Sequence, residues 1–281
     1  MSKVKKSGIT RRNFLIGLAA GAAPLLGGPH LKFDAWAAKE VSQLKIAVEF
    51  NDHAASAYVA IDKKLYEAEG LNVHAYESYA TGAALASALT QGAISAAYIC
   101  LIPAINAYAN GGVPIKVVCG THLYGYGLAV NPEKIKRVKD LETPGIRIGC
   151  LPEGTAVDTV MHRTMEKFNL NKKQVLSQTK RMGPAKAILA VRAKLVDAFF
   201  LPEHWATMAD RYGFPMLLTA KDVWPGMIGS VVVVKKELIR DEPETVRKLV
   251  RATKNATDWM PGHPEESAQI TARYLSFENE K

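Results

Sequence analysis

Four short turns of the chain carry side chains that could contact a small ligand, and they form two pairs with a constant offset of 102 residues. Residues 51–53 (Asn-Asp-His) pair with residues 153–155 (Glu-Gly-Thr), and residues 101–103 (Leu-Ile-Pro) pair with residues 203–205 (Glu-His-Trp). Each turn follows an expected strand, and ligands of doubly wound sheets bind beyond the carboxyl ends of the strands. We therefore expect the four turns to converge on one cleft.

One of these four turns, and one further helix start, have the chemistry of an oxyanion site. Gly154-Thr155, ahead of an expected helix, offers backbone N–H groups, a hydroxyl and the positive end of the helix dipole. Thr81-Gly82 offers the same groups in the first half of the chain. Both threonines could instead be ordinary helix N-caps, a role that Ser and Thr often fill.

Three carboxylates argue in the other direction. Asp52, Glu153 and Glu203 in one cleft would repel a bare anion and would favour amines or ring N–H donors. They could also face solvent or pair with Lys or Arg. His53 and His204 could donate hydrogen bonds to a ligand, although histidines beside strand ends are often structural.

Aromatic side chains near the turns could form flat walls for a ligand. Tyr124, Tyr126 and Trp205 are the candidates, and packing in the core is the equal alternative. Sulfonate, amino-sulfonate and aminopyrimidine ligands all remain open. The expected ligand-binding residues are Asn51, Asp52, His53, Thr81, Gly82, Leu101, Ile102, Tyr124, Glu153, Gly154, Thr155, Glu203 and His204.

The elements that position these turns repeat as well, because residues 45–103 and 147–205 follow one plan of strands and helices. Strands that alternate with helices of this length favour parallel, doubly wound sheets. One unit built twice predicts an α/β fold of two doubly wound lobes joined by a hinge, with a ligand cleft between them. Strands are expected at 44–49, 71–75, 96–100, 115–120, 146–150, 175–178, 197–201 and 230–234, and helices at 58–68, 81–92, from 103, and at 157–168, 184–194, 203–212 and 242–260.

These elements predict three segments. We expect a twin-arginine-type signal peptide at 1–37, lobe 1 at 40–129 plus 231–281, and lobe 2 at 130–230. The two crossovers between the lobes are expected near 128–130 and 230–234. The chain stops at Lys281 within an expected helix, which indicates a truncated sequence or a short tail.

The N-terminus has the features of an export signal. Lysines precede Thr10-Arg11-Arg12-Asn13-Phe14-Leu15, an apolar run follows at 15–28, and Ala35-Trp36-Ala37 offers a small-x-small cleavage site. Paired arginines before Asn-Phe-Leu indicate a twin-arginine signal, and therefore export to the periplasm in the folded state. An uncleaved membrane anchor is the alternative, but the run is shorter than the roughly 20 residues that a span needs.

Composition and cysteine spacing exclude several classes of protein. The net charge of +9 falls to +4 without residues 1–37, so the basic charge does not indicate nucleic-acid binding. Cys100, Cys119 and Cys150 form no CxxC pair, so no metal site is expected, and a disulfide between two of them stays open. No GxSxG, P-loop or GxGxxG motif occurs. We expect neither an enzyme nor a cofactor.

Several segments resemble the extracellular solute-binding proteins of ABC importers, in the branch that serves nitrate, sulfonate, taurine and thiamine precursors. Residues 64–73 (Lys-Leu-Tyr-Glu-Ala-Glu-Gly-Leu-Asn-Val) are similar to an EGL segment of that family, residues 138–141 to its step into lobe 2, and residues 151–156 to its Gly-Ser/Thr turn. Residues 201–204 stand where the family has Trp-Glu-Pro, but the order here is Pro-Glu and the Trp is Trp205. The similarity covers about residues 44–275.

The resemblance implies a two-lobe periplasmic binding protein that delivers a small organic or oxyanionic solute, of the sulfonate, taurine or nitrate kind, to an ABC permease and its ATPase. It favours a ligand-binding role for Gly154-Thr155. It also implies contact with the membrane only through the permease or an uncleaved signal. A pyrimidine- or thiamine-precursor-binding protein and a ligand-sensing domain of a signalling system are the alternatives, and the residues do not identify the solute.

Overall fold

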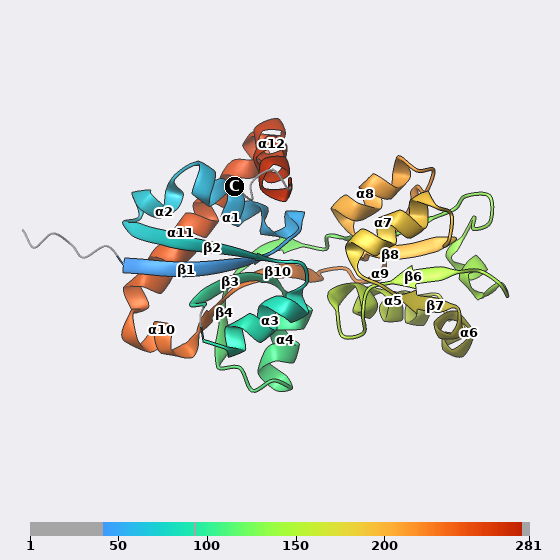
Figure 1. Cartoon of the computed structure of the whole chain (residues 1–281), viewed down its shortest axis with the longest axis horizontal. Coiled ribbons are helices and arrows are strands. Elements are labelled where there is room, and N and C mark those ends of the chain that lie inside the picture. Colours follow the sequence, from blue (N-terminus) through green and yellow to red (C-terminus); the bar gives the residue numbers. More distant parts are fainter. Residues whose placement is uncertain (1–41, 93, 277–281) are drawn as a thin grey trace, which may run out of the picture. The chain divides into compact units, whose positions relative to one another are not determined.

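The computed structural model describes residues 42–92 and 94–276, in which the strands form two separate five-stranded sheets (Figure 1). The first sheet has the order β2-β1-β3-β10-β4. Strand β1 is parallel to β2 and β3, whereas β10 is antiparallel to β3 and β4. Its strands are β1 (Ser42–Glu49), β2 (Leu71–Tyr79), β3 (Ala96–Cys100), β4 (Ile115–Leu123) and β10 (Ile228–Lys235).

The second sheet has the order β7-β6-β8-β5-β9. Strand β6 is parallel to β7 and β8, and β5 is antiparallel to β8 and β9. Its strands are β5 (Tyr126–Val130), β6 (Ile148–Cys150), β7 (Thr179–Arg181), β8 (Ala198–Pro202) and β9 (Met216–Thr219). We call the first sheet with its helices lobe 1 and the second sheet with its helices lobe 2; both belong to one compact unit of the chain.

The internal repeat predicted from the sequence is present in three dimensions. Strands β3 and β8 occupy the central position of their sheets and begin 102 residues apart. Helices α3 (Gly82–Thr90) and α7 (Pro184–Arg192) are separated by the same offset. So are the first residues of α4 (Leu101–Ala109) and α8 (Glu203–Asp210). The predicted fold class, two α/β lobes, is therefore confirmed.

Lobe 1 has a hydrophobic core on each face of its sheet. Successive side chains of a strand point to opposite faces, and in β1 Ile46 and Val48 join one core while Ala47 joins the other. The first core is covered by α1 (Ala55–Asp62) and α11 (Pro243–Trp259), and the second by α3 and α4. The remaining lobe 1 elements are η1 (Asp52–Ala54), α2 (Leu65–Ala68), α10 (Lys236–Asp241), η3 (Met260–Gly262) and α12 (Pro264–Leu275).

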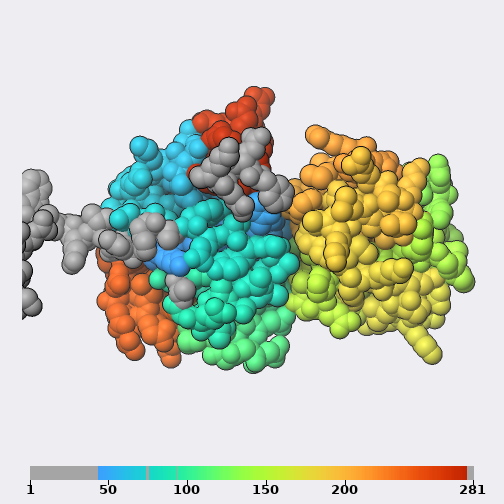
Figure 2. Space-filling model, viewed as in Figure 1, coloured from blue at the N-terminus to red at the C-terminus, as the bar shows by residue number. Residues whose placement is uncertain are grey.

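The C-terminal helix α12 completes lobe 1 next to its first helix, α1. The rings of Tyr58 in α1 and Tyr274 in α12 stack with their centroids 5.1 Å apart. Figure 2 shows the red α12 segment beside blue residues from the start of the lobe. Residues from both ends of the described chain thus contribute to one core.

Lobe 2 has a continuous core that includes Ile148, Phe199 and Phe200. A Cβ at Gly149 would lie 2.1 Å from the Phe199 ring, so glycine is what allows β6 to lie against this side chain. The helical elements of lobe 2 besides α7 and α8 are η2 (Val138–Glu142), α5 (Ala156–Lys167), α6 (Lys172–Ser177) and α9 (Ala220–Val223). Among the described residues, no helix is long and apolar enough to cross a membrane.

The crossovers between the lobes lie a few residues before the positions expected from the sequence. Strand β5 pairs with β8 and β9, so residues 126–129 belong to lobe 2 and not to lobe 1. Strand β10 begins at Ile228, so residues 228–230 belong to lobe 1. The first crossover is Tyr124-Gly125, where both residues have positive φ angles of 62° and 85°. The backbone N–H of Tyr124 donates to the Met227 carbonyl at 3.0 Å, which joins the two crossovers.

One expected strand is helical. Residues 175–177 form the end of α6, and the strand follows at β7 (Thr179–Arg181). Asn171 caps α6 by accepting a hydrogen bond from the Gln174 N–H at 3.1 Å, a local signal for a helix start that outweighs the apolar Val-Leu pair. The predicted signal peptide, residues 1–37, lies outside the described residues.

Candidate ligand-binding site

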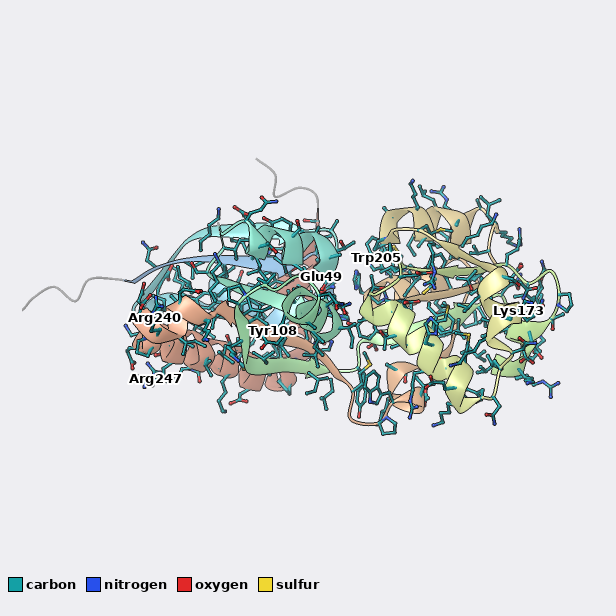
Figure 3. The ribbon with its side chains drawn as sticks, turned by 90° about the horizontal axis from the view of Figure 1, so that it is seen from below. Glu49, Tyr108, Lys173, Trp205, Arg240 and Arg247 are labelled. Atoms are coloured by element: carbon teal, nitrogen blue, oxygen red, sulfur yellow. The ribbon has the colours of Figure 1, made fainter. Side chains whose placement is uncertain are left out.

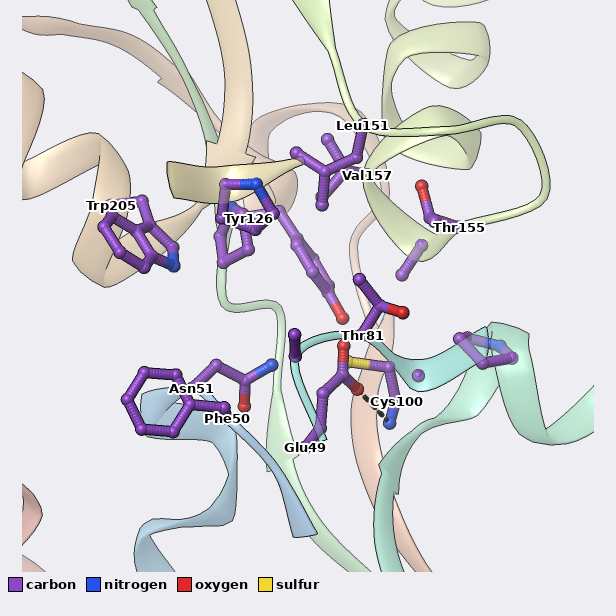
Figure 4. Close-up of a pocket in the computed structure, with 16 residues that line it drawn as sticks. Glu49, Phe50, Asn51, Thr81, Cys100, Tyr126, Leu151, Thr155, Val157 and Trp205 are labelled. Atoms are coloured by element: carbon purple, nitrogen blue, oxygen red, sulfur yellow. Dashed lines mark hydrogen bonds between the residues drawn. The ribbon is translucent and has the colours of Figure 1, made fainter. Parts of the chain in front are cut away.

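A pocket lies where the carboxyl ends of strands from both sheets meet (Figure 4). Glu49 ends β1, Cys100 ends β3, Pro202 ends β8 and Leu151 follows β6, and all four line the pocket. Lobe 1 and lobe 2 therefore both contribute walls. The space open to water-sized molecules is only about 20 Å³, roughly room for one water.

Glu49 supplies a carboxylate to this pocket. Its Oε2 accepts a hydrogen bond from the Cys100 backbone N–H at 3.1 Å (Figure 4). A Cβ at Gly82 would lie 2.6 Å from the Pro103 ring and 3.1 Å from this same oxygen, so glycine at the start of α3 leaves space beside the carboxylate. No Lys or Arg side chain is among the described residues that line the pocket.

Tyr126 is the second polar group of the pocket. Its side chain is 2% exposed, and its hydroxyl has no hydrogen-bond partner in the described part of the chain. Burial, followed by the nearby Cys100 thiol and Glu49 carboxylate, raises the pKa of Tyr126 well above its usual range. A buried hydroxyl without a partner is costly. A bound water or ligand atom in the pocket would satisfy it.

The other walls are largely apolar. Trp205 of α8 and Phe50 after β1 line one side of the pocket, and Thr155 lies on the other (Figure 4). Figure 3 shows Glu49 and Trp205 on the sides of their lobes that enclose the pocket. Flat apolar walls beside a few polar groups are typical of small-molecule sites.

A second cavity of about 250 Å³ adjoins the first, with which it shares Thr81, Pro103 and Thr155. Glu153 and Gly154 line it from lobe 2. Asn106 of α4 donates from Nδ2 to the Gly154 carbonyl at 2.9 Å, which is a direct contact between the lobes. Glu153 itself is largely in solvent, with 83% of its side chain exposed.

The Thr155 hydroxyl and the Gly154 N–H, which were expected to hold an oxyanion, already have partners within the protein. The Thr155 hydroxyl accepts from the Asp158 N–H at 3.3 Å and donates to the Pro152 carbonyl at 2.8 Å, so it is the N-cap of α5. The Gly154 N–H donates to the Asp158 carboxylate at 3.1 Å. Asp158 also binds Arg181 at 2.6 Å. Asp158 therefore occupies the place in which a ligand anion was expected.

Thr81 has the same capping role in lobe 1, because its hydroxyl accepts from the Ala84 N–H at 3.2 Å. Thr81 and Gly82 nevertheless line the pocket. Asn51 also lines it and is 3% exposed, and its Oδ1 accepts from the His53 N–H at 3.1 Å. In both Thr81 and Asn51 the side-chain oxygen therefore caps the turn that follows it.

Asp52 and His204, both expected at the ligand, bind each other. Their Oδ1 and Nδ1 atoms are 2.7 Å apart, between η1 of lobe 1 and α8 of lobe 2. Burial opposes the charge of Asp52, but the hydrogen bond with His204 and the neighbouring histidines lower its pKa to about 2. Asp52 is therefore an ionised partner of His204.

His53 lies at the first crossover. It is 5% exposed, and its Nε2 is 2.7 Å from the Gly125 carbonyl, which can only accept. Its Nδ1 is 3.4 Å from the Cys100 Sγ. The ring of His122 lies 4.3 Å from that of His53, centroid to centroid. These contacts stabilise the backbone of the first crossover.

The remaining expected residues lie beside the pocket. Tyr124 is at the crossover and, like Ile102, contacts the core of lobe 2. Glu203 is exposed, and its backbone N–H donates to the Gly125 carbonyl at 2.9 Å. Leu101 begins α4 and contacts a core of lobe 1. None of these four is among the described residues that line the two cavities.

Sequence reasoning did not single out Glu49 or the hydroxyl of Tyr126 as ligand contacts. Glu49 is the last residue of an expected strand, and the apolar pattern therefore places it in the strand and not in the turn after it. The available signal was a charged residue at the carboxyl end of an apolar strand, which is where doubly wound folds bind ligands. No group of His, Cys, Asp and Glu among the described residues could hold a metal ion.

The amino-acid sequence matches a known protein family. A sequence model of the NMT1-like family matches residues 37–276. Curated proteins of Brucella abortus, named as binding proteins, are 25% identical over 234 residues, which cover 78% of this chain and 67% of theirs.

Solved structures share the fold. The periplasmic aliphatic sulphonate binding protein SsuA from Escherichia coli matches with a TM-score of 0.71 and 18% identity, over 83% of this chain and 79% of that one. The alkanesulfonate-binding protein SsuA from Xanthomonas axonopodis pv. citri, bound to MOPS, matches at 0.70 and 20%, over 83% and 78%. The nitrate-binding protein NrtA from Synechocystis matches at 0.71 and 18%, over 83% and 66%. These likenesses confirm the periplasmic binding protein fold, and the matched proteins are binding proteins and not enzymes.

Proposed function

Because the chain belongs to the NMT1-like family, we propose that it is the extracytoplasmic solute-binding component of an ABC importer and that it captures a small organic solute between its lobes. The observation that carries this proposal is the pocket at the strand ends, to which Glu49 and Phe50 contribute from lobe 1 and Leu151 and Trp205 from lobe 2. A solute in this site would contact both lobes at once.

Binding then requires the lobes to move. The main pocket has room for about one water, so a solute enters only when the lobes separate. The chain crosses between the lobes twice, at Tyr124-Gly125 and just before Ile228, and these segments form the hinge. Solute contacts from both lobes stabilise the closed state, which the permease of the importer recognises.

A thermal-shift screen of the protein without residues 1–37 tests this function. The screen includes alkanesulfonates, taurine, nitrate and aminopyrimidines. A true ligand at a hundred times its dissociation constant adds about 2.7 kcal/mol of stability. We expect at least one compound to raise the melting temperature and Trp205→Ala to reduce that increase.

The matched control is Trp224→Ala, because Trp224 contacts the core of lobe 2 and does not line the pocket. A ligand whose effect is lost with Trp224→Ala but kept with Trp205→Ala would bind elsewhere. If no compound in the panel changes the melting temperature, the proposed function is not supported.

The proposed location rests on the N-terminal motif. We propose that Arg11 and Arg12 direct the folded precursor to the twin-arginine translocase. Replacing both by Lys should leave the precursor in the cytoplasm, as measured by cell fractionation. Export in normal amounts would show that a different route is used.

A further inference from the structure

The polar groups of the pocket suit one chemical class of solute, an inference that rests on the proposed function. We propose that Glu49 and Tyr126 form a polar subsite that selects a compound with N–H donors, such as an amidine, a protonated amine or an amino-substituted nitrogen ring. A bare oxyanion would not be selected.

Glu49 provides the acceptor of this subsite. Among the described residues it takes part in no ion pair, and its Oε2 has one hydrogen bond, from the Cys100 N–H. A carboxylate in a closed site needs compensating charge or hydrogen bonds. Solute N–H groups would supply them once the lobes close around it.

Tyr126 provides the second polar atom. Its buried hydroxyl has no hydrogen-bond partner in the described structure, and Figure 4 shows it directed toward Glu49 and Cys100. A hydroxyl can both donate and accept. An amino-substituted nitrogen ring or an amidine, which offers more than one polar atom in a plane, can reach Glu49 and Tyr126 together.

The surrounding charges disfavour an anion. The described residues that line the two cavities include the carboxylates of Glu49 and Glu153 but no Lys or Arg. Arg181 is bound to Asp158 at 2.6 Å and pairs with Glu153 at 3.9 Å. The Gly154 N–H is bound to the same Asp158. An oxyanion in the main pocket would therefore meet the Glu49 carboxylate, with no cation in the described part of the pocket lining.

The test compares N–H donors with anions. Calorimetric titration of the protein without residues 1–37 would use benzamidine and 4-aminopyrimidine as N–H donors, with benzenesulfonate and nitrate as anions. We expect only the donor compounds to bind. Tight binding of the anions without the donors would overturn the inference and leave the proposed function standing, whereas no binding by any of the four compounds or in the thermal-shift screen would refute both.

Variants locate the subsite. Glu49→Gln keeps the size of the side chain and should weaken donor binding about 10- to 100-fold, in the range of hydrogen bonds to charged groups. Tyr126→Phe should weaken it about fivefold. The matched control is Glu133→Gln, which removes an exposed carboxylate that lines neither cavity and should leave donor binding unchanged.

A separate measurement keeps the test decisive if Glu49→Gln folds poorly. Tyr126→Phe removes a hydroxyl that has no partner in the described structure, so it should not lower the stability of the ligand-free protein. Reduced donor binding at unchanged stability supports the subsite. Unchanged donor binding by both Tyr126→Phe and a folded Glu49→Gln would overturn it.

Discussion

Asp52 and His204 join the two lobes directly, because the Asp52 Oδ1 and the His204 Nδ1 are 2.7 Å apart although the residues are separated by 152 positions in the sequence. Both were expected to face a ligand, and in this structure they face each other. The low pKa of Asp52, about 2, keeps the carboxylate ionised near neutral pH. The pair therefore stabilises the arrangement of the lobes in this structure.

Loss of this pair should open the protein. We expect His204→Gln to increase the radius of gyration of the ligand-free protein in small-angle X-ray scattering, since one contact between the lobes is lost. Asp52→Asn should act in the same direction, and the double variant should add little to either change. His162→Gln is the control, because His162 lies on α5 with 41% of its side chain exposed. An unchanged radius in both single variants would show that the pair does not hold the lobes together.

Thr155 should contribute to stability more than to ligand binding. Thr155→Ala removes the N-cap of α5 and should lower the free energy of unfolding by about 1 kcal/mol, measured by urea denaturation. Thr155→Ser keeps the hydroxyl and should preserve most of the stability. Thr90→Ala, at an exposed position near the end of α3, is the control. Normal stability with weakened solute binding would instead support the ligand-binding role expected from the sequence.

His122 should make the protein sensitive to mild acid. Its two ring nitrogens are buried without hydrogen-bond partners in the described structure. Burial and the neighbouring His53, opposed by Asp52, lower its pKa from 6.5 to about 3. The unfolded chain therefore binds a proton below about pH 6.5 that the folded chain does not. The contribution of neutral His122 to the free energy of unfolding should be fully present above that pH. It should decrease as the pH falls toward 3, by at most about 1.4 kcal/mol per pH unit.

The measurement is the difference in urea midpoint between about pH 7.5 and about pH 5. His122→Phe cannot titrate and should show a smaller loss of stability than the unmodified protein over this interval. His162→Gln, which replaces an exposed histidine, should behave like the unmodified protein. Equal pH dependence in all three proteins would rule out His122 as the source.

Asp197 should be the most sensitive carboxylate of lobe 2. It is fully buried and accepts hydrogen bonds from the Arg147 side chain at 2.7 Å and from Lys134 at 2.8 Å. Burial opposes its charge, but these bonds hold the pKa of Asp197 well below its usual range. The stabilisation is present above about pH 4 and is lost as the pH falls below it.

We expect Asp197→Asn to reduce the free energy of unfolding by about 2 kcal/mol near neutral pH, in the range of a hydrogen bond to a charged group. The control is Glu166→Gln, whose ion pairs with Arg163 and Lys172 are exposed to solvent and should contribute much less than the buried contacts of Asp197. If urea denaturation shows equal losses in the free energy of unfolding for the two variants, burial does not strengthen the hydrogen bonds of Asp197.

The amino-acid sequence by itself determined the elements and their duplication. The apolar strand 96–100 and its counterpart at 198 could be recognised locally, because burial of a strand depends on its own run of apolar side chains. The offset of 102 residues predicted two similar lobes because each repeat contains a complete β-α-β-α-β unit. The resemblance of residues 64–73 and 151–156 to solute-binding proteins identified the family.

Only the tertiary structure decided which groups remain available to a solute. No local pattern specifies the partners that these features need. Strand β5 pairs with β8, Asp52 binds His204, and the Gly154 N–H donates to Asp158. Glu49 and Tyr126 come from different sheets and meet only where the strand ends converge. Secondary structure follows from side-chain periodicity along the chain, whereas a binding site consists of the polar groups left unsatisfied after all long-range contacts have formed.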